Sequence, residues 1–357
     1  MYILLGPWWF GVGWLAASIA SLVVAVGAAA LAPKLLSGNP RSLGALRLGM
    51  ISTGLAVVGI SALLFWLVVE LLGYSVSLMY LALLAAGIGV LQWLISPYII
   101  NMMYRVKPAG PELDWLRLEL RRLAERSGLG KPPRLVVAET DAPNAFAYGN
   151  PLTGYYVAVT RGILRIMPRE ELVAVIGHEL GHLRHRDVQV ILALSLLPSI
   201  AYFIGRVLVD IGFFSGMAGG RDRDEGGSAI LVLVGFIILV ASIVLHFLVR
   251  HFSRLREYYA DAHSAMVTGE PRLLQRALAR LHVAYMNSPR LVRELRRQSA
   301  ASMLLIVSYF YQPDIDTIVE ELKRQPTNPL MELFSTHPPI PKRLRFLDAL
   351  RQSLTQG

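Results

Sequence analysis

The sequence contains no cysteine and few charged side chains. With no Cys among 357 residues, it cannot form a disulfide framework, a thiolate metal site or a cysteine nucleophile. Any metal bound by this chain would therefore have nitrogen and oxygen ligands. Only 17% of the residues are charged and 54% are hydrophobic, a balance too apolar for a soluble globular protein. The composition indicates a membrane protein.

Charge is absent from the start of the chain. Residues 1–33 include no Asp, Glu, Lys or Arg, whereas a cleavable secretory signal begins with a basic segment. This stretch is therefore predicted to be a retained membrane anchor. The net charge of +10 comes mostly from basic residues that flank apolar stretches or lie on polar helices. We therefore expect the lipid bilayer as a partner and no nucleic acid.

Long apolar runs are abundant. A hydrocarbon layer about 30 Å thick is crossed by about 20 helical residues. Five stretches are long enough, namely 8–31, 47–72, 76–99, 189–212 and 228–249. The basic residues beside them belong on the cytoplasmic side, which places the N-terminus and a flexible loop at 213–227 outside the cell. A multi-pass cell-membrane protein is predicted, with two polar blocks facing the cytoplasm.

The first polar block shows patterns of both helix and strand. Residues 113–126 have the spacing of an amphipathic helix, and strands are expected at 135–139 and 155–159. Between the two strands lies NAFAYGNPLTG, which contains turn signals. A further helix is predicted to begin at Pro168 and to continue into the fourth apolar stretch.

The run VIGHELGHLRHRD at 175–187 concentrates three histidines and two carboxylates on that helix. His178 and His182 are four residues apart, so they project from one helix face and can bind zinc together. Glu179 can then act as the general base for the attacking water. His185 is not predicted to be a ligand, because a catalytic zinc keeps an open position. H-E-x-x-H also arises by chance, so the motif needs a third ligand.

Glu257 in SRLREYYADAHSA is the candidate for that ligand. Asp261 follows four residues later on the same helical face, where it can orient a ligating histidine. The alternative is a helix with two solvated acids. Because the fifth apolar stretch returns the chain to the side that carries HELGH, a joint metal site is favoured.

Four segments together resemble the HtpX-type membrane zinc metalloproteases, which are related to the CAAX prenyl endopeptidases. They are HELGH, SRLREYYADAHSA, PNAFAYGNPLTGYYVAVTRGIL and ELFSTHPPIPKRL, and the resemblance covers about residues 104–350. It implies that His178, His182 and Glu257 bind one zinc ion per chain, with Glu179 as the catalytic glutamate and Asp261 as a supporting acid. It also implies membrane-protein quality control or a stress response, with misfolded or damaged membrane proteins or unfolded polypeptides as substrates. Family members have two N-terminal spans, where three are predicted here.

The resemblance also suggests a substrate strand. An edge strand at the cleft could bind an extended peptide through its backbone, and a buried strand or turn is the alternative. The residues concerned are Asn144, Ala145, Phe146 and Ala147.

In STHPPIPKRL, prolines are expected to fix an extended path that carries His337 and Arg343. Either side chain could donate to the oxyanion or to the substrate backbone. The alternative is a C-terminal turn in which Arg343 pairs with an acid.

The predicted fold class is mainly α: a polytopic α-helical membrane protein with a cytoplasmic zincin-like α+β metalloprotease domain. The expected divisions are an N-terminal membrane region at 1–103, the two protease segments 104–188 and 250–357, and a transmembrane hairpin at 189–249. Two other functions remain open, an intramembrane protease and a zinc-stabilised scaffold or transporter. Charged residues around HELGH disfavour the first, and Glu179 disfavours the second. The other histidines are expected at interfacial or surface positions, namely His246, His251, His263 and His282.

Overall fold

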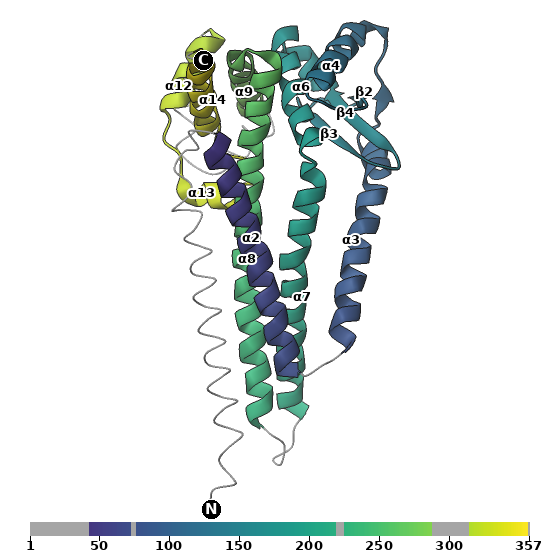
Figure 1. Ribbon diagram of the computed structural model, residues 1–357, viewed down its shortest axis with the longest axis vertical. Helices are drawn as coiled ribbons and strands as arrows, with labels where there is room; N and C mark the ends of the chain where they lie inside the picture. The colour runs from purple at the N-terminus through teal and green to yellow at the C-terminus, as the bar shows by residue number, and fades with distance from the viewer. Residues whose placement is uncertain (1–42, 73–75, 219–224, 288–313, 356–357) are drawn as a thin grey trace, which may run out of the picture. The chain divides into compact units, whose positions relative to one another are not determined.

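A computed structural model describes residues 43–72, 76–218, 225–287 and 314–355 (Figure 1). The chain is mainly helical and includes one small sheet, as the sequence predicts. It divides into two compact units. In the described part, the first unit comprises Arg47–Leu91 and Gln189–Ser253, and the second comprises residues 43–46, Gln92–Val188 and Arg254 onward.

Three described segments are long and apolar enough to cross a membrane, which fits a membrane protein. They are Leu43–Trp66, Gln189–Ser215 and Gly227–Thr268. The predicted stretch at 8–31 lies outside the described residues, and the one at 76–99 falls on a helix whose side chains are described only in part. The count of five spans therefore stays a prediction.

The first unit is made of long helices packed through apolar side chains. They are most of α2 (Leu43–Leu72) and α7 (Asp187–Ala218), the part of α8 (Glu225–Thr268) up to Ser253, and the start of α3 (Val76–Met103). Because α7 runs to Ala218 and α8 starts at Glu225, the loop expected at 213–227 is helical at both ends, and 219–224 lies outside the described residues.

Glycines allow α7 and α8 to approach closely. A Cβ atom on Gly205 would lie 2.9 Å from the carbonyl oxygen of Gly235, and one on Gly235 would lie 2.8 Å from the carbonyl oxygen of Gly205. Both distances are too short for a side chain, so only glycine fits at this crossing. Small residues serve the same purpose wherever helices pack in a membrane.

A four-stranded sheet forms the frame of the second unit, in the order β1-β2-β4-β3. β2 and β4 are parallel, while β3 is antiparallel to β4 and forms an edge of the sheet. The strands expected at 135–139 and 155–159 are thus present, displaced by one residue at most. The bounds are β1 Lys107–Pro108, β2 Arg134–Ala138, β3 Ala145–Asn150 and β4 Gly154–Thr160.

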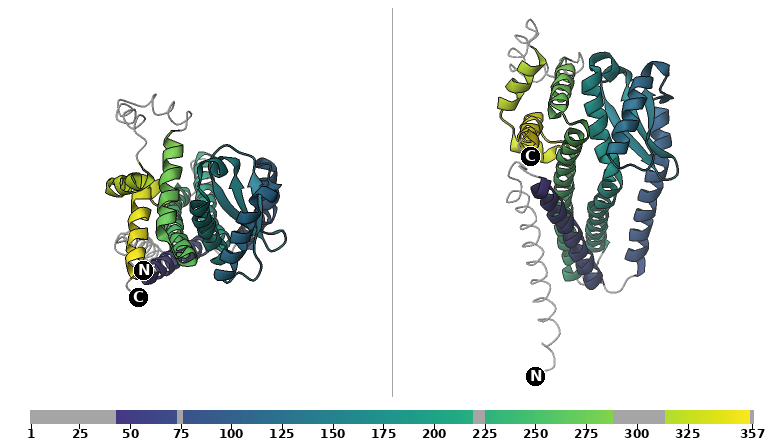
Figure 2. Two further views of the ribbon diagram at one scale, coloured as in Figure 1. Left: turned by 90° about the horizontal axis from the view of Figure 1, so that it is seen from above. Right: turned by 45° about the horizontal axis from the view of Figure 1, so that its top comes forward.

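Helices α4 (Asp114–Arg126) and α6 (Arg169–Arg184) pack with the sheet around one core (Figures 1 and 2). The amphipathic helix predicted at 113–126 is confirmed, and its leucines at 116, 120 and 123 are buried. The remaining helical elements of this unit are η1 Pro111–Leu113, α5 Arg161–Ile166, α9 Pro271–Met286, α12 Ile315–Arg324, α13 Pro329–Phe334 and α14 Ile340–Thr355.

Candidate active site

Two glycines bring α6 against the last turns of α8. A Cβ on Gly181 would lie 3.0 Å from the Cα of Ala260, and one on Gly177 would lie 3.2 Å from the Oγ of Ser264. The Ser264 hydroxyl donates a 2.6 Å hydrogen bond to the carbonyl of Ala174 on α6. This close contact places the histidines of HELGH beside the acids of EYYAD.

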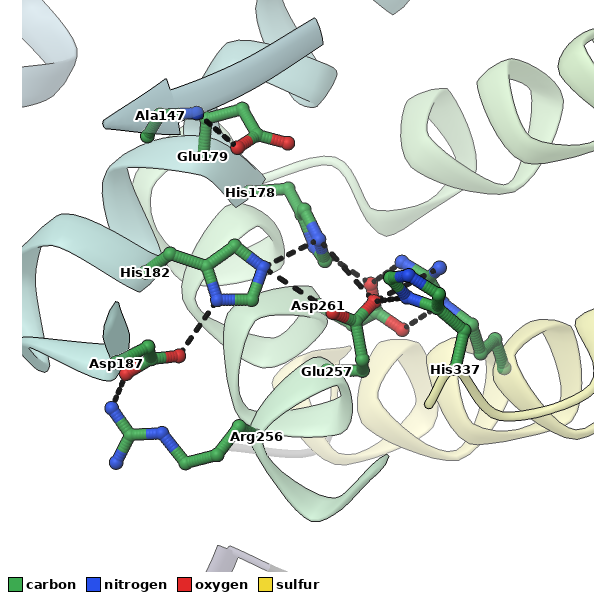
Figure 3. Close-up of polar contacts among 10 residues, drawn as sticks. Ala147, His178, Glu179, His182, Asp187, Arg256, Glu257, Asp261 and His337 are labelled. Carbon is green, nitrogen blue, oxygen red and sulfur yellow. Dashed lines mark hydrogen bonds and ion pairs between the residues drawn. The ribbon is translucent and has the colours of Figure 1, made fainter. Parts of the chain in front are cut away.

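His178, His182 and Glu257 converge on one point (Figure 3). The two Nε2 atoms are 3.1 Å apart, and the Glu257 oxygens lie 3.8 Å from that of His178 and 3.5 Å from that of His182. Ligands bound about 2.0–2.1 Å from a tetrahedral metal lie about 3.3–3.4 Å from one another. The observed spacing therefore fits a metal ion at the centre.

The outer nitrogen of each histidine faces a buried carboxylate. Nδ1 of His178 lies 2.9 Å from Oδ1 of Asp261, and Nδ1 of His182 lies 2.7 Å from Oδ2 of Asp187. A carboxylate favours a proton on the nitrogen that it faces, which leaves the Nε2 of a neutral imidazole as an acceptor. Two lone pairs then point at each other across 3.1 Å, beside a third from Glu257. This donor set calls for a cation.

Asp187 is a site residue that the sequence reading missed. The predicted continuous helix is wrong here, because α6 ends at Arg184, Arg186 has a φ of 54°, and α7 begins at Asp187. This break turns the Asp187 carboxylate back toward His182. The available signal in the sequence was an acid five residues after the second histidine.

Arg256 pairs with the other oxygen of Asp187. Its guanidinium also donates a 2.8 Å hydrogen bond to the backbone carbonyl of His185. Both side chains are buried, so the pair links the residue next to Glu257 with the end of the HELGH helix. The result is a chain of contacts from Arg256 through Asp187 to His182 (Figure 3).

Arg343 holds Asp261 by two hydrogen bonds. Its Nε lies 2.8 Å from Oδ2 and its Nη2 lies 2.5 Å from Oδ1, while its Nη1 is 3.3 Å from Oε2 of Glu257. The extended path expected at Arg343 is wrong, since α14 already begins at Ile340. Pro341 does not prevent this, because proline is well tolerated in the first turn of a helix.

His337 lies on the segment between α13 and α14, and its side chain is 67% exposed. Its Nδ1 is 3.0 Å from Oε2 of Glu257, and this hydrogen bond raises the pKa of the imidazole despite partial burial. Arg254 of α8 supports the segment by donating to the carbonyls of Glu332 and Ser335, at 2.9 and 2.8 Å. His337 is thus an accessible donor beside the metal cluster.

Glu179 turns away from the cluster toward the edge of the sheet. Its Oε2 accepts a 2.9 Å hydrogen bond from the backbone N–H of Ala147 on β3 (Figure 3). Burial raises the pKa of this carboxyl, and the neighbouring His182 and His178 offset the effect only in part. A buried carboxyl with a raised pKa is suited to accepting a proton.

The four residues of the expected substrate strand alternate in direction. Asn144 bonds toward β4, since its N–H donates to the Thr160 hydroxyl and its carbonyl accepts from the Thr160 N–H. Phe146 pairs with Ala158, whereas the Ala147 N–H points outward to Glu179. The backbone groups of Ala145 point outward as well, because the direction of hydrogen bonding alternates along a strand. The segment therefore leads into an edge strand next to Glu179.

The prediction of an interfacial or surface position is wrong for His263. Its side chain is buried, and its Nε2 lies 2.8 Å from the hydroxyl of Ser127 at the end of α4. His185 stacks edge-on against the ring of Tyr259, with 4.4 Å between the ring centroids. It does not belong to the metal cluster found among the described residues.

The fold and the three metal donors are those expected of a metallopeptidase. Similarity to known proteins identifies the family. The chain matches Peptidase family M48 over residues 112–351, more than half its length, and it belongs to that family. This confirms the resemblance drawn from the four motifs.

Relatives from archaea agree over most of the chain. A "Protease HtpX homolog" of Aeropyrum pernix is 54% identical over 309 residues, covering 85% of this chain and 95% of that protein. Homologues of the same name from Pyrobaculum calidifontis and Thermoplasma acidophilum are 39% and 35% identical. They cover 90% and 86% of this chain, and 93% and 98% of their own lengths.

A solved structure shares the fold. The crystal structure of S. mikatae Ste24p aligns with a TM-score of 0.52 at 18% identity and covers 85% of this chain. This chain spans 65% of that protein. The likeness supports the predicted fold class of a polytopic helical membrane protein with a zincin-like α+β domain.

Proposed function

We propose that this protein is a zinc-dependent endopeptidase that cleaves polypeptides at the cytoplasmic surface of the membrane. One observation carries the proposal: a cluster of three metal donors stands beside a separate buried carboxylate, and that carboxylate is attached to an edge strand. Membership of Peptidase family M48 supports it. The expected zinc ligands, base and substrate strand are thus close together in one unit.

His178, His182 and Glu257 would hold the ion. Two imidazoles and one carboxylate are a common ligand set for catalytic zinc, and the chain has no thiolate that would favour a purely structural site. When bound, zinc acidifies water and polarises a carbonyl. Asp261 and Asp187 orient the two histidines, and Arg343 holds Asp261.

Glu179 would accept the proton of the attacking water and pass it to the leaving amine. The outward backbone groups of β3 would bind the substrate as an added strand. Such main-chain recognition depends little on side chains, which suits misfolded or damaged membrane proteins and unfolded polypeptides as substrates. Membrane-protein quality control is the role that we propose for this activity.

His337 is the better placed of the two expected oxyanion donors, because its ring is exposed whereas Arg343 already binds Asp261. Removing such a donor typically costs about 100-fold or more in turnover. We expect that loss in His337→Ala, with metal content and melting temperature unchanged. Near-normal turnover by the folded, metal-loaded variant would exclude the role.

A metal-stabilised scaffold or transporter is the main alternative. A structural metal site has no use for a buried carboxylate that lies outside the ligand set and faces a strand edge. The position of Glu179 therefore favours hydrolysis.

The test combines metal analysis with cleavage of unfolded casein by the purified protein. Glu179→Gln should lose at least about 100-fold in turnover while the metal stays bound, because the residue is a base and not a ligand. Glu257→Ala should lose the metal itself. Glu119→Gln, a change at a partly exposed position on α4, should affect neither property. Full turnover by metal-loaded Glu179→Gln would refute the proposed mechanism.

The orientation in the membrane needs its own test. Because the natural chain has no cysteine, single cysteines at positions 130, 220 and 340 report their side of the membrane through an impermeant thiol reagent. The positive-inside bias predicts labelling of intact cells at 220 alone. Labelling at 130 or 340 would reverse the proposed orientation.

A further inference from the structure

A cavity of about 510 Å³ lies at the opposite edge of the sheet from β3, bordered by β1, β2, α4 and the last turns of α3. Since the strand order is β1-β2-β4-β3, two strands separate β1 from the edge strand that contacts Glu179. The cavity is therefore distinct from the candidate active site. It belongs entirely to the second unit.

The lining of this cavity is strongly basic. It includes Lys107, Arg117, Arg121 and Arg134, and none of the described residues that line it is acidic. Two of these cations have acidic neighbours, Arg117 with Asp114 and Lys107 with Glu139 at 3.6 Å.

The other two cations, Arg121 and Arg134, have no acidic partner in the described part of the chain. Arg134 donates to the carbonyl of Thr153 and lies 4.4 Å from the centroid of the Tyr156 ring. Both contacts leave its charge in place. The cavity therefore has a net positive potential that favours an anion.

Apart from Asn101, the rest of the lining is apolar, and it includes three prolines. Pro108, Pro132, Pro133, Leu135 and Tyr156 form part of the wall. Proline restricts the backbone, so the wall loses little conformational entropy when a ligand binds. A ligand that fits this wall would combine a negative group with apolar parts.

Apolar side chains are exposed on α3 immediately before the cavity. Tyr98, Met102 and Met103 are 63%, 74% and 70% exposed, and Asn101 on the same turns lines the cavity. In a membrane protein, an exposed apolar helix end followed by several cations is the arrangement found at the lipid–water interface.

We propose that this cavity binds the phosphate headgroup of an acidic phospholipid, whose acyl chains lie along the exposed apolar end of α3. Arginine suits the task because its planar guanidinium binds phosphate oxygens by paired hydrogen bonds. The apolar turns of α3 distinguish a lipid from a free phosphate, which would gain nothing from them. This inference rests on the membrane character of the chain and does not depend on the proposed peptidase activity.

The test measures lipid binding by the full-length protein in detergent micelles. The probes are phosphatidylglycerol and phosphatidylcholine with the same acyl chains, and sodium phosphate is the soluble arm. Each cation near a headgroup contributes about a fivefold gain in affinity. We therefore expect Arg121→Gln to bind phosphatidylglycerol about 5-fold more weakly, and the Arg121→Gln/Arg134→Gln double variant about 25-fold more weakly.

Arg122→Gln is the matched control. Arg122 is the next residue on α4, but its guanidinium donates to Glu119 at 2.8 Å and does not line the cavity. The affinity of the Arg122→Gln variant for phosphatidylglycerol should stay within about twofold of the wild-type value, since only a screened surface charge is removed. Because Arg121 has no described partner, its single variant tests the site even if the double variant unfolds.

Three outcomes would overturn the assignment. Arg121→Gln could bind phosphatidylglycerol as tightly as Arg122→Gln does, or the wild-type protein could fail to prefer phosphatidylglycerol over phosphatidylcholine. Alternatively, sodium phosphate could bind as tightly as the lipid, which would make the cavity a site for a soluble anion.

Discussion

The two units of this protein both have apolar cores, but they differ in the polar side chains that they bury. In the described part of the first unit, the buried polar side chains are the hydroxyls of Thr53 and Ser242, and each donates to a carbonyl of its own helix. The second unit buries a network of charges. Its members include Glu171, His178, Glu179, Asp187, Arg256, Glu257, Asp261 and Arg343.

This contrast shows how one chain separates stability from chemistry. Helices in lipid gain little from the hydrophobic effect, so they depend on close packing at glycines such as Gly205 and Gly235. A catalytic metal site needs ligands at fixed angles, and buried hydrogen-bonded charges provide that order. Adding side-chain volume at a helix crossing should therefore destabilise the first unit, whereas removing a buried charge should destabilise the second.

Removing Arg343 should have the largest effect on stability. Arg343→Met leaves the buried Asp261 without its bidentate partner, and breaking a buried pair in this way costs about 3–5 kcal/mol. The free energy of unfolding of the second unit in chemical denaturant measures the loss. A decrease below about 1 kcal/mol would mean that water or another group satisfies Asp261.

The double variant Arg343→Met/Asp261→Leu separates stability from function. Replacing both members of a buried ion pair with apolar residues is often neutral, so most of the lost stability should return. Metal affinity should not return, because His178 would still lack the acid at its Nδ1. Recovery of both properties would show that Asp261 does not support the metal site.

Gly205→Ala tests the first unit. Its new Cβ would lie 2.9 Å from a backbone oxygen of α8, so the helices must separate, and overpacking of this kind costs about 1–3 kcal/mol. Gly59→Ala on α2 is the matched control, because no atom lies within 4 Å of its Cβ position. Helix propensity predicts that this control stabilises the protein by up to about 1 kcal/mol. Equal shifts in melting temperature for the two variants would contradict glycine-dependent packing.

Asp187→Asn should weaken metal binding while leaving the ligands in place. Loss of an acid that orients a ligating histidine typically costs about 10- to 100-fold in metal affinity. Competition with a zinc chelator measures the dissociation constant, and Asp141→Asn is the control, since the Asp141 side chain is 91% exposed. Unchanged metal affinity in Asp187→Asn would show that Asp187 only pairs with Arg256 and does not support the metal site.

The sequence predicted the parts of the second unit that depend on local patterns. The leucine spacing of α4, the start of α6 after Pro168 and the two strands that flank NAFAYGNPLTG all follow from periodicity and turn residues. The metal cluster followed from two helical spacings, H-E-x-x-H and E-x-x-x-D. The hairpin between those motifs then suggested that they meet.

Contacts between distant segments could not be predicted in the same way. Arg343 lies 82 residues from Asp261, and His263 is buried because the end of α4, 136 residues earlier in the chain, covers it. Asp187 was missed for a local reason, since the positive φ of Arg186 breaks a pattern that otherwise reads as continuous helix. Arg256 was grouped with the basic residues that flank apolar stretches, but it is buried against Asp187 beside the metal cluster.

The smallest expected effect is on pH dependence, and it tests whether the charges of the second unit act as burial implies. Burial raises the pKa of Glu179 above its usual value of 4.5, and His182 and His178 offset this only in part. A base must be ionised to accept a proton, so kcat/KM should fall as the pH is lowered through the raised pKa, with a midpoint above 4.5.

The same shift has a consequence for stability. An acid whose pKa is higher in the folded state than in the unfolded state loses stability as the pH rises past its unfolded value, because ionisation then favours unfolding. At pH 7, metal-free Glu179→Gln should therefore melt at a higher temperature than the metal-free wild-type protein, and the difference should vanish below about pH 4. Metal content measured at each pH separates this effect from acid release of the ion. A midpoint at or below 4.5, together with equal melting temperatures at pH 7, would show that water reaches Glu179 and that its burial does not control the chemistry.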